Sequence, residues 1–167
     1  LVAIVAPTCG HCGLGVRALS TQLLPEFQEG EIEVFVVWNG IVPADVELGA
    51  RRFSERYLHP AIRYYWDETG RASRAFAQHV GLGEGRHITN LYYLYGPGDT
   101  WDPHGTMASE PPGQNALLAG WMPGNPRARY GQSNEVRLPA LEIPRVRDAA
   151  RQLLAEGERG GKESGAP

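Results

Sequence analysis

The chain has 167 residues, of which 42% are apolar, and a formal net charge of −3, so it can form one globular domain with a buried core. This small acidic charge, without any basic run, gives no field that would attract nucleic acid or an anionic membrane surface. No apolar stretch reaches the roughly 20 residues that span a bilayer, and we therefore expect no membrane insertion within this segment.

The first half of the sequence predicts strands and helices in alternation. The apolar run at 1–6 has the length and pattern of a central strand covered on both faces, and Pro7 ends it. The elements expected next are a helix over 12–24, a strand over 32–38, a helix over 44–57 and a strand over 61–66. This alternation predicts an α/β sheet rather than a sandwich.

After a turn at 67–70, the sequence predicts a short helix over 72–80 and a fourth strand over 90–95. The composition then changes, because the segment 96–134 is rich in glycine and proline but still carries apolar residues. We interpret it as a long loop that packs or functions, since an idle loop of this length is unusual in a compact domain.

The final element predicted is an amphipathic helix over 144–155. We expect a single domain over 1–156, followed by a disordered tail over 157–167. The chain begins with Leu1 inside a strand pattern, so we also expect that a segment precedes it, where a signal peptide or anchor would lie.

The chain has only two cysteines, Cys9 and Cys12, which follow the first strand and precede a helix. As a structural staple, a disulfide across so short a loop would stabilise the fold only weakly. As half of a zinc site, the pair would need two more ligands, and no second cysteine pair or HxxxH motif is present. The histidines are scattered, at His11, His59, His79, His87 and His104.

A redox dithiol fits the order of strand, turn and helix better. A thiol at a helix N-terminus faces unpaired backbone N–H groups and the positive end of the helix dipole, which stabilise its thiolate. Cys9 would be exposed and nucleophilic at the turn, whereas Cys12 would be shielded one turn deeper and would resolve the mixed disulfide. The spacing therefore favours thiol-disulfide chemistry.

The stretch APTCGHC at 6–12 resembles the active site of the thioredoxin superfamily, and Cys-Gly-His-Cys is the tetrapeptide found in protein disulfide isomerases. The additional helix and strand over about 44–66 are similar to those of TlpA-type bacterial thiol-disulfide oxidoreductases. The resemblance covers about 1–95 and the final helix. It implies a thioredoxin-like α/β fold with a central mixed sheet flanked by helices, a helix-strand insertion and a long loop before the C-terminal helix.

The activity implied by this resemblance is thiol-disulfide exchange with protein substrates, with Cys9 as the nucleophile and Cys12 as the resolving cysteine. No cofactor is needed, because the electrons travel as thiols. The resemblance to the isomerases implies that His11 tunes the dithiol: it would stabilise the thiolate and so make the disulfide more oxidising. The alternative for His11 is an exposed polar loop residue.

The substrate groove implied by the resemblance includes Gly10, Ile88 and Thr89. Thr89 falls where the family carries a cis-proline opposite the dithiol, and we expect a trans peptide there, since a cis bond before a non-proline residue costs about 2.5–4 kcal/mol. The chain departs from the family at two further positions. Thr8 replaces an aromatic residue, and Ala3 replaces a buried carboxylate that aids proton transfer.

The second function considered is a non-catalytic protein that holds copper or mercury between Cys9, Cys12 and a loop ligand such as His104 or Met107. The other interpretation of the loop is a surface insertion that packs on the sheet edge. Its apolar and soft residues include Trp101, Trp121 and Met122. A peroxidase is disfavoured, because Ala6 stands where that chemistry needs a threonine. We predict no metal in the redox site.

The expected partners are proteins that carry thiols or disulfides, together with a redox partner protein. Glycine and proline richness with only two cysteines suits an exported bacterial protein, so the resemblance implies a periplasmic or other extracytoplasmic location. An anchor upstream of the segment is compatible with this, and the cytoplasm is the alternative.

Overall fold

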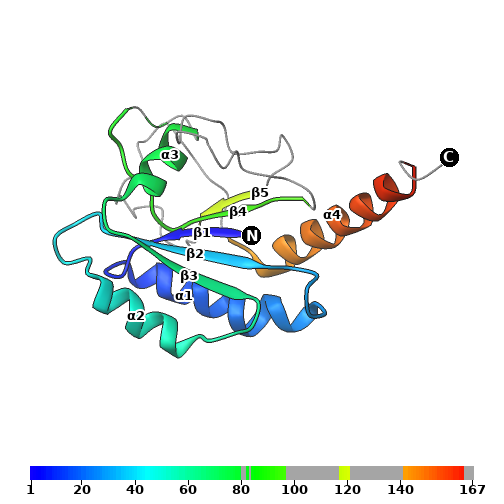
Figure 1. Cartoon of the computed structure of the whole chain (residues 1–167), viewed down its shortest axis with the longest axis horizontal. Coiled ribbons are helices and arrows are strands. Elements are labelled where there is room, and N and C mark those ends of the chain that lie inside the picture. Colours follow the sequence, from blue (N-terminus) through cyan, green and yellow to red (C-terminus); the bar gives the residue numbers. More distant parts are fainter. Residues whose placement is uncertain (80–81, 83, 97–116, 121–140, 164–167) are drawn as a thin grey trace.

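The computed structural model describes residues 1–79, 82, 84–96, 117–120 and 141–163 (Figure 1). These residues form a mixed sheet with the strand order β3-β2-β1-β4-β5. Its strands are β1 (Val2–Val5), β2 (Val34–Asn39), β3 (Ile62–Asp67), β4 (Leu91–Leu94) and β5 (Leu117–Gly120). The first three strands are parallel, whereas β4 runs antiparallel to both β1 and β5.

Helices cover both faces of this sheet. They are α1 (Gly10–Ala18), α2 (Glu47–Arg56), α3 (Arg71–His79) and α4 (Ile143–Glu163). Figure 1 shows α1 and α2 against one face and α3 against the other. The α/β class and the mixed sheet flanked by helices are therefore confirmed.

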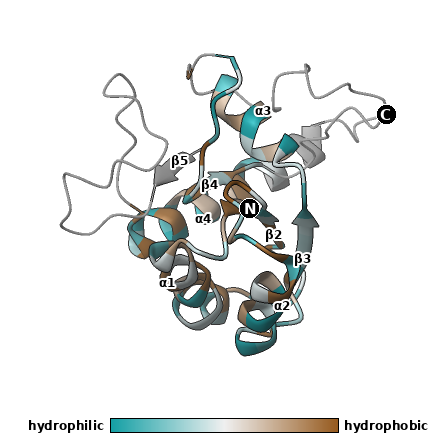
Figure 2. Cartoon of the chain, turned by 90° about the vertical axis from the view of Figure 1, so that its left-hand side faces the viewer, coloured by the Kyte–Doolittle hydropathy of each residue, from teal (hydrophilic) through white to brown (hydrophobic). Residues whose placement is uncertain are grey.

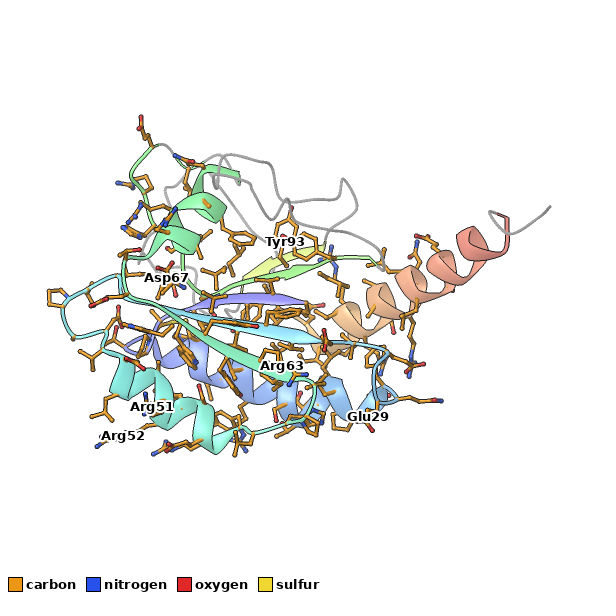
Figure 3. All side chains as sticks on the ribbon, in the orientation of Figure 1. Glu29, Arg51, Arg52, Arg63, Asp67 and Tyr93 are labelled. Atoms are coloured by element: carbon orange, nitrogen blue, oxygen red, sulfur yellow. A yellow bond between two sulfur atoms is a disulfide. The ribbon has the colours of Figure 1, made fainter. Side chains whose placement is uncertain are left out.

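The core consists of two layers because the side chains of each strand alternate between the two faces. On β1, Ala3 and Val5 join the layer under α1, α2 and α4, while Val2 and Ile4 join the layer under α3. In that second layer Phe76 packs on Tyr93, with ring centroids 5.7 Å apart. Tyr93 extends from β4 on the side of the sheet that carries α3 (Figure 3). The prediction that β1 is a central strand, buried on both faces, is confirmed.

The helical segment that starts with α1 is longer than the helix predicted over 12–24, although α1 itself is shorter. It begins at Gly10 rather than at position 12, and after α1 the chain continues through a π-helical turn (Leu19–Leu23) into a 3₁₀ turn (Leu24–Glu26). Pro25 lies near the start of the 3₁₀ turn, where its missing N–H leaves no hydrogen bond unmade, and the helical segment ends one residue later, at Glu26.

The segment 96–134, which we predicted to be a long loop, contains a strand. β5 pairs antiparallel with β4, with Leu91 opposite Gly120 and Leu94 opposite Leu117. This pairing covers an edge of β4 that would otherwise expose unpaired backbone groups. A four-residue strand inside a segment rich in glycine and proline gives too short a pattern for the sequence to predict it.

The last helix is also longer than predicted. We expected a helix over 144–155 and a disordered tail over 157–167, but α4 extends from Ile143 to Glu163. Because elongation adds one hydrogen bond per ordered residue, a helix anchored by packing at its start can continue through a polar segment. Val146 and Ala150 provide that anchor in the core. None of the helices in the described part of the chain has both the length and the apolar composition of a membrane span.

Candidate active site

The turn from β1 to α1, which carries Cys9, lies at the carboxyl ends of the parallel strands, on the left in Figure 1 and on the side that faces the viewer in Figure 2. Three connections meet at this end of the sheet: the turn from β1 to α1, the loop from β2 to α2, and the turn from β3 to α3. Because β1 is parallel to its neighbour β2, both strands deliver their following segments to the same edge. The fold therefore places the CxxC sequence among residues from three connections.

Cys9 and Cys12 form a disulfide, with their Cα atoms 5.3 Å apart. Cys9 is the N-cap residue of α1, and its sulfur accepts a hydrogen bond of 3.2 Å from the backbone N–H of Cys12. The side chain of Cys9 is partly exposed, whereas Cys12 is 0% exposed. The first cysteine is thus accessible from solvent and the second is not.

The residue before the dithiol, Thr8, is held by a buried carboxylate from the next connection. Asp45 is 7% exposed, and its Oδ1 accepts hydrogen bonds from the Thr8 N–H at 2.9 Å and the Thr8 hydroxyl at 2.7 Å. Its Oδ2 accepts from the N–H groups of Ile41 and Val42, at 3.2 and 3.0 Å. One side chain therefore joins the β2–α2 loop to the active-site turn.

Thr89 lies on the other side of the dithiol, in the turn that precedes β4. Its hydroxyl oxygen is 3.3 Å from Cys12 Sγ. The described residues contain no cis peptide bond, so Thr89 has the trans peptide that the sequence predicts. The structure therefore places Thr89 beside the dithiol, as the spacing of the fourth strand indicates, and its contact to substrate stays a prediction.

The turn before β4 is fixed from behind by polar groups in the core. The hydroxyl of the fully buried Ser73 donates to the carbonyl of Ile88 at 2.6 Å and accepts from the N–H of Ile88 at 2.9 Å. The N–H of Ser73 in turn donates to Asn39 Oδ1 at 3.2 Å. The N–H of Ile88 is thus bonded inside the protein, and its side chain is buried, which leaves Thr89 as the more accessible member of the predicted pair.

Gly10 and His11 are both exposed at the first turn of α1. A Cβ added to Gly10 would meet no atom within 4 Å, so the surface beside the dithiol is open there. This openness fits a contact surface for a substrate and an imidazole that faces solvent. The roles assigned to these two residues stay predictions.

Burial changes the acidity of two side chains around the site. Tyr92 lies in the core under α1, and burial raises its pKa. Burial lowers the pKa of His87, the charge of Arg74 lowers it further, and the charge of Asp67 acts in the opposite direction. Asp67 ends β3 beside the start of α3 (Figure 3), where its Oδ2 accepts from the N–H of Ala72 at 2.7 Å.

Sequence reasoning missed three side chains that build this site: Asn39, Asp45 and Ser73. Asn39 carried a signal, because a polar residue that ends an apolar strand in an α/β protein lies at the edge where sites form. Asp45 and Ser73 carried no such signal, because the partners that give them a role lie far away in the sequence. Thr8 is 37 positions from Asp45, and Asn39 and Ile88 are 34 and 15 positions from Ser73.

Metal ligands are not gathered in the described part of the chain, where no group of three or more His, Cys, Asp or Glu side chains is arranged to hold an ion. The loop residues considered as ligands or as packing residues lie outside the described residues. They are Trp101, His104, Met107, Trp121 and Met122.

No protein-family model matches the chain, and the curated proteins and the solved structures give no significant match. The fold and the site together define an α/β domain with a CxxC disulfide at the carboxyl end of a mixed sheet.

Proposed function

We propose that the protein is a thiol-disulfide oxidoreductase of thioredoxin-like fold. The observation that carries the proposal is the asymmetry of the disulfide: Cys9 is partly exposed at a helix N-cap, and Cys12 is fully buried one turn later. A dithiol needs this asymmetry to exchange disulfides in order, with one sulfur open to a partner and one held back to resolve the intermediate.

The order of the elements supports the same proposal. The mixed sheet is flanked by helices on both faces, and α2 and β3 follow the second strand, in the order that the sequence predicts for the additional helix and strand. The loop ligands considered for the alternative, a soft-metal carrier, lie outside the described residues.

In the reducing direction, the Cys9 thiolate attacks one sulfur of a substrate disulfide, and the other substrate sulfur leaves as a thiolate. Cys12 then attacks the Cys9 sulfur, the mixed disulfide breaks, and the second substrate sulfur leaves. The substrate gains two electrons and two protons while the protein forms its disulfide. The Cys12 N–H, which points at Cys9 Sγ in the oxidised form, would also stabilise the Cys9 thiolate.

Proteins are the proposed substrates because the surface beside the dithiol is open and partly apolar. Val42 and Val46, on either side of Asp45, are 44% and 50% exposed, and Leu14 on α1 is 49% exposed. Exposed aliphatic side chains on the helix that carries the dithiol and on the loop that holds Thr8 suit a polypeptide partner. An extracytoplasmic location and a dedicated redox partner belong to the same proposal.

Reduction of insulin by dithiothreitol tests the proposal, since the protein should accelerate it. Cys9→Ser should abolish the acceleration. Cys12→Ser should instead accumulate a mixed disulfide with the substrate through Cys9, which gel electrophoresis without reductant resolves. A wild-type protein that neither reduces insulin nor equilibrates with glutathione, yet retains copper through dialysis, would replace this function with metal binding.

A further inference from the structure

The hydroxyl of Thr89 lies 3.3 Å from the sulfur of Cys12, on the buried side of the disulfide. In a disulfide neither sulfur carries a hydrogen, so the hydroxyl is the donor of this contact and Cys12 Sγ is the acceptor. A sulfur accepts weakly while it is neutral, and far more strongly once it carries a negative charge. The hydroxyl therefore faces the sulfur atom that becomes negatively charged when the disulfide opens.

We propose that the Thr89 hydroxyl stabilises the thiolate of Cys12 whenever the disulfide opens or closes, by donating a hydrogen bond to the charged sulfur. This inference rests on the proposed function of the dithiol. Cys12 is 0% exposed, and a buried anion is strongly disfavoured unless a donor faces it. Ala3, where the resemblance leads us to expect a carboxylate, is fully buried and provides no polar side chain.

The position of Thr89 is fixed by the core. Ser73 bonds both backbone groups of Ile88, and Asn39 bonds the N–H of Ser73. On the other side, Asn90 has a φ of 61°, in the left-handed region that asparagine tolerates better than most residues. A turn held at both ends in this way presents the hydroxyl in one direction, so Ser73 is a positioning residue for Thr89.

In the oxidising direction, the protein disulfide takes two electrons from two substrate thiols. A substrate thiolate attacks Cys9 Sγ, the Cys9–Cys12 bond breaks, and its electron pair goes to Cys12 Sγ, where the Thr89 O–H donates to the new thiolate. A second substrate thiolate then attacks the substrate sulfur and releases Cys9. The substrate is oxidised by two electrons, and the dithiol is reduced by two. In the reducing direction Cys12 attacks as the thiolate that Thr89 stabilises.

The Thr89 substitutions leave in place the titratable groups that flank Cys12 on α1 and on its neighbours, and only the second readout replaces one of them, Cys9. These groups are Cys9 and His11 on α1, Asp45 behind Thr8, and Tyr92 in the core under α1.

The test compares Thr89→Val and Thr89→Ala with Thr89→Ser, which keeps the hydroxyl. Reduction of the oxidised protein by dithiothreitol should be about tenfold slower without the hydroxyl, as for one hydrogen bond to a charged group, and close to wild type in the serine variant. Ser73→Ala should also slow the reduction by dithiothreitol, because it removes the bonds that hold Ile88 beside Thr89. Thr21→Val is the matched control, because the Thr21 hydroxyl bonds the Arg17 carbonyl on an exposed surface away from the sulfurs.

A second readout separates this role from a merely structural one. In a Cys9→Ser background, the ultraviolet absorbance of the thiolate reports the pKa of Cys12 directly, and Thr89→Val should raise that pKa by about one unit, which is the equilibrium counterpart of a tenfold effect. Equal rates and equal pKa values with and without the hydroxyl would overturn the inference. Failure of insulin reduction with a shifted Cys12 pKa would instead overturn the proposed function and leave the role of Thr89 in place.

Discussion

Asp45 holds Thr8 through two hydrogen bonds to a single carboxylate oxygen, one from the backbone N–H at 2.9 Å and one from the hydroxyl at 2.7 Å. Thr8 is the residue before Cys9, and Asp45 belongs to the loop after the neighbouring strand. The geometry of the CxxC turn thus depends on a residue that is distant in sequence, and the loop between β2 and α2 depends on the same carboxylate.

We predict that Asp45→Ala lowers the free energy of unfolding by about 3 kcal/mol, because it leaves several donors without their charged acceptor in a buried place. Urea denaturation of the oxidised protein measures this. Asp148→Ala is the control: Asp148 pairs with Arg147 on the surface of α4, and its loss should change stability by less than about 0.5 kcal/mol. Equal effects of the two substitutions would show that Asp45 is not a structural link.

The sequence predicted the described elements other than β5, and it located the dithiol at the start of a helix. It did so because apolar periodicity and the CxxC spacing are local signals that a single chain carries. It could not predict the hydrogen bonds that shape the site, because Asp45 and Thr8, like Ser73 and Ile88, are distant in the sequence and meet only in the folded protein. Thr89 is intermediate: its place followed from strand spacing, but its contact with Cys12 rather than Cys9 did not.

Gly15 on α1 is required by the approach of Tyr92. A Cβ at Gly15 would lie 2.6 Å from Tyr92 Cζ and would overlap the hydroxyl oxygen even more. We predict that Gly15→Ala destabilises the protein by about 1–3 kcal/mol, although alanine favours helices, because the buried tyrosine ring has no room to move.

Two further variants test this interpretation of Gly15. Gly10→Ala lies on the same helix with open space around it, and it should leave the midpoint of urea unfolding nearly unchanged. The double variant Gly15→Ala, Tyr92→Phe should recover part of the lost stability, because it removes the atom that overlaps most. A double variant less stable than the sum of the single changes would contradict the close-approach explanation.

Cys9 should react before Cys12 in the reduced protein. Cys9 is partly exposed at the N-cap of α1, where the Cys12 N–H and the helix dipole favour its thiolate, while Cys12 is buried. Alkylation with a limiting amount of iodoacetamide at mildly acidic pH, followed by peptide mass spectrometry, measures the order. Cys9→Ser and Cys12→Ser variants calibrate the two labels, and preferential labelling of Cys12 would reverse the roles.

His11→Pro should make the protein more reducing. If the imidazole stabilises the thiolate as in disulfide isomerases, the wild-type potential should lie nearer to about −180 mV than to about −270 mV, and 30 mV corresponds to about 1.4 kcal/mol. His11 is the second residue of α1, where proline removes no helical hydrogen bond. Equilibration with glutathione measures the change, and an unchanged equilibrium constant would rule out the tuning role of His11.

His87 should make the stability of the protein depend on pH. Its Nδ1 is buried without a hydrogen-bond partner among the described residues, and the ring packs against Gly70, where an added Cβ would lie 2.9 Å from His87 Cε1. Burial lowers the pKa of His87 below its usual 6.5, and the charge of Arg74 lowers it further.

The sign of the pH effect follows from which state binds the proton more readily. Since the folded pKa of His87 is the lower one, the unfolded chain takes up the proton first as the pH falls below about 6.5. The stabilisation is therefore complete above the unfolded pKa and is lost as the pH falls through the folded one. The midpoint of urea unfolding should be measured between pH 8 and about pH 5, a range that includes the usual histidine pKa of about 6.5. As the pH falls, this midpoint should decline less in His87→Gln than in wild type. Arg74→Gln should also flatten the decline, because it removes a charge that lowers the pKa, and parallel profiles in all three proteins would show that folding does not change the pKa of His87.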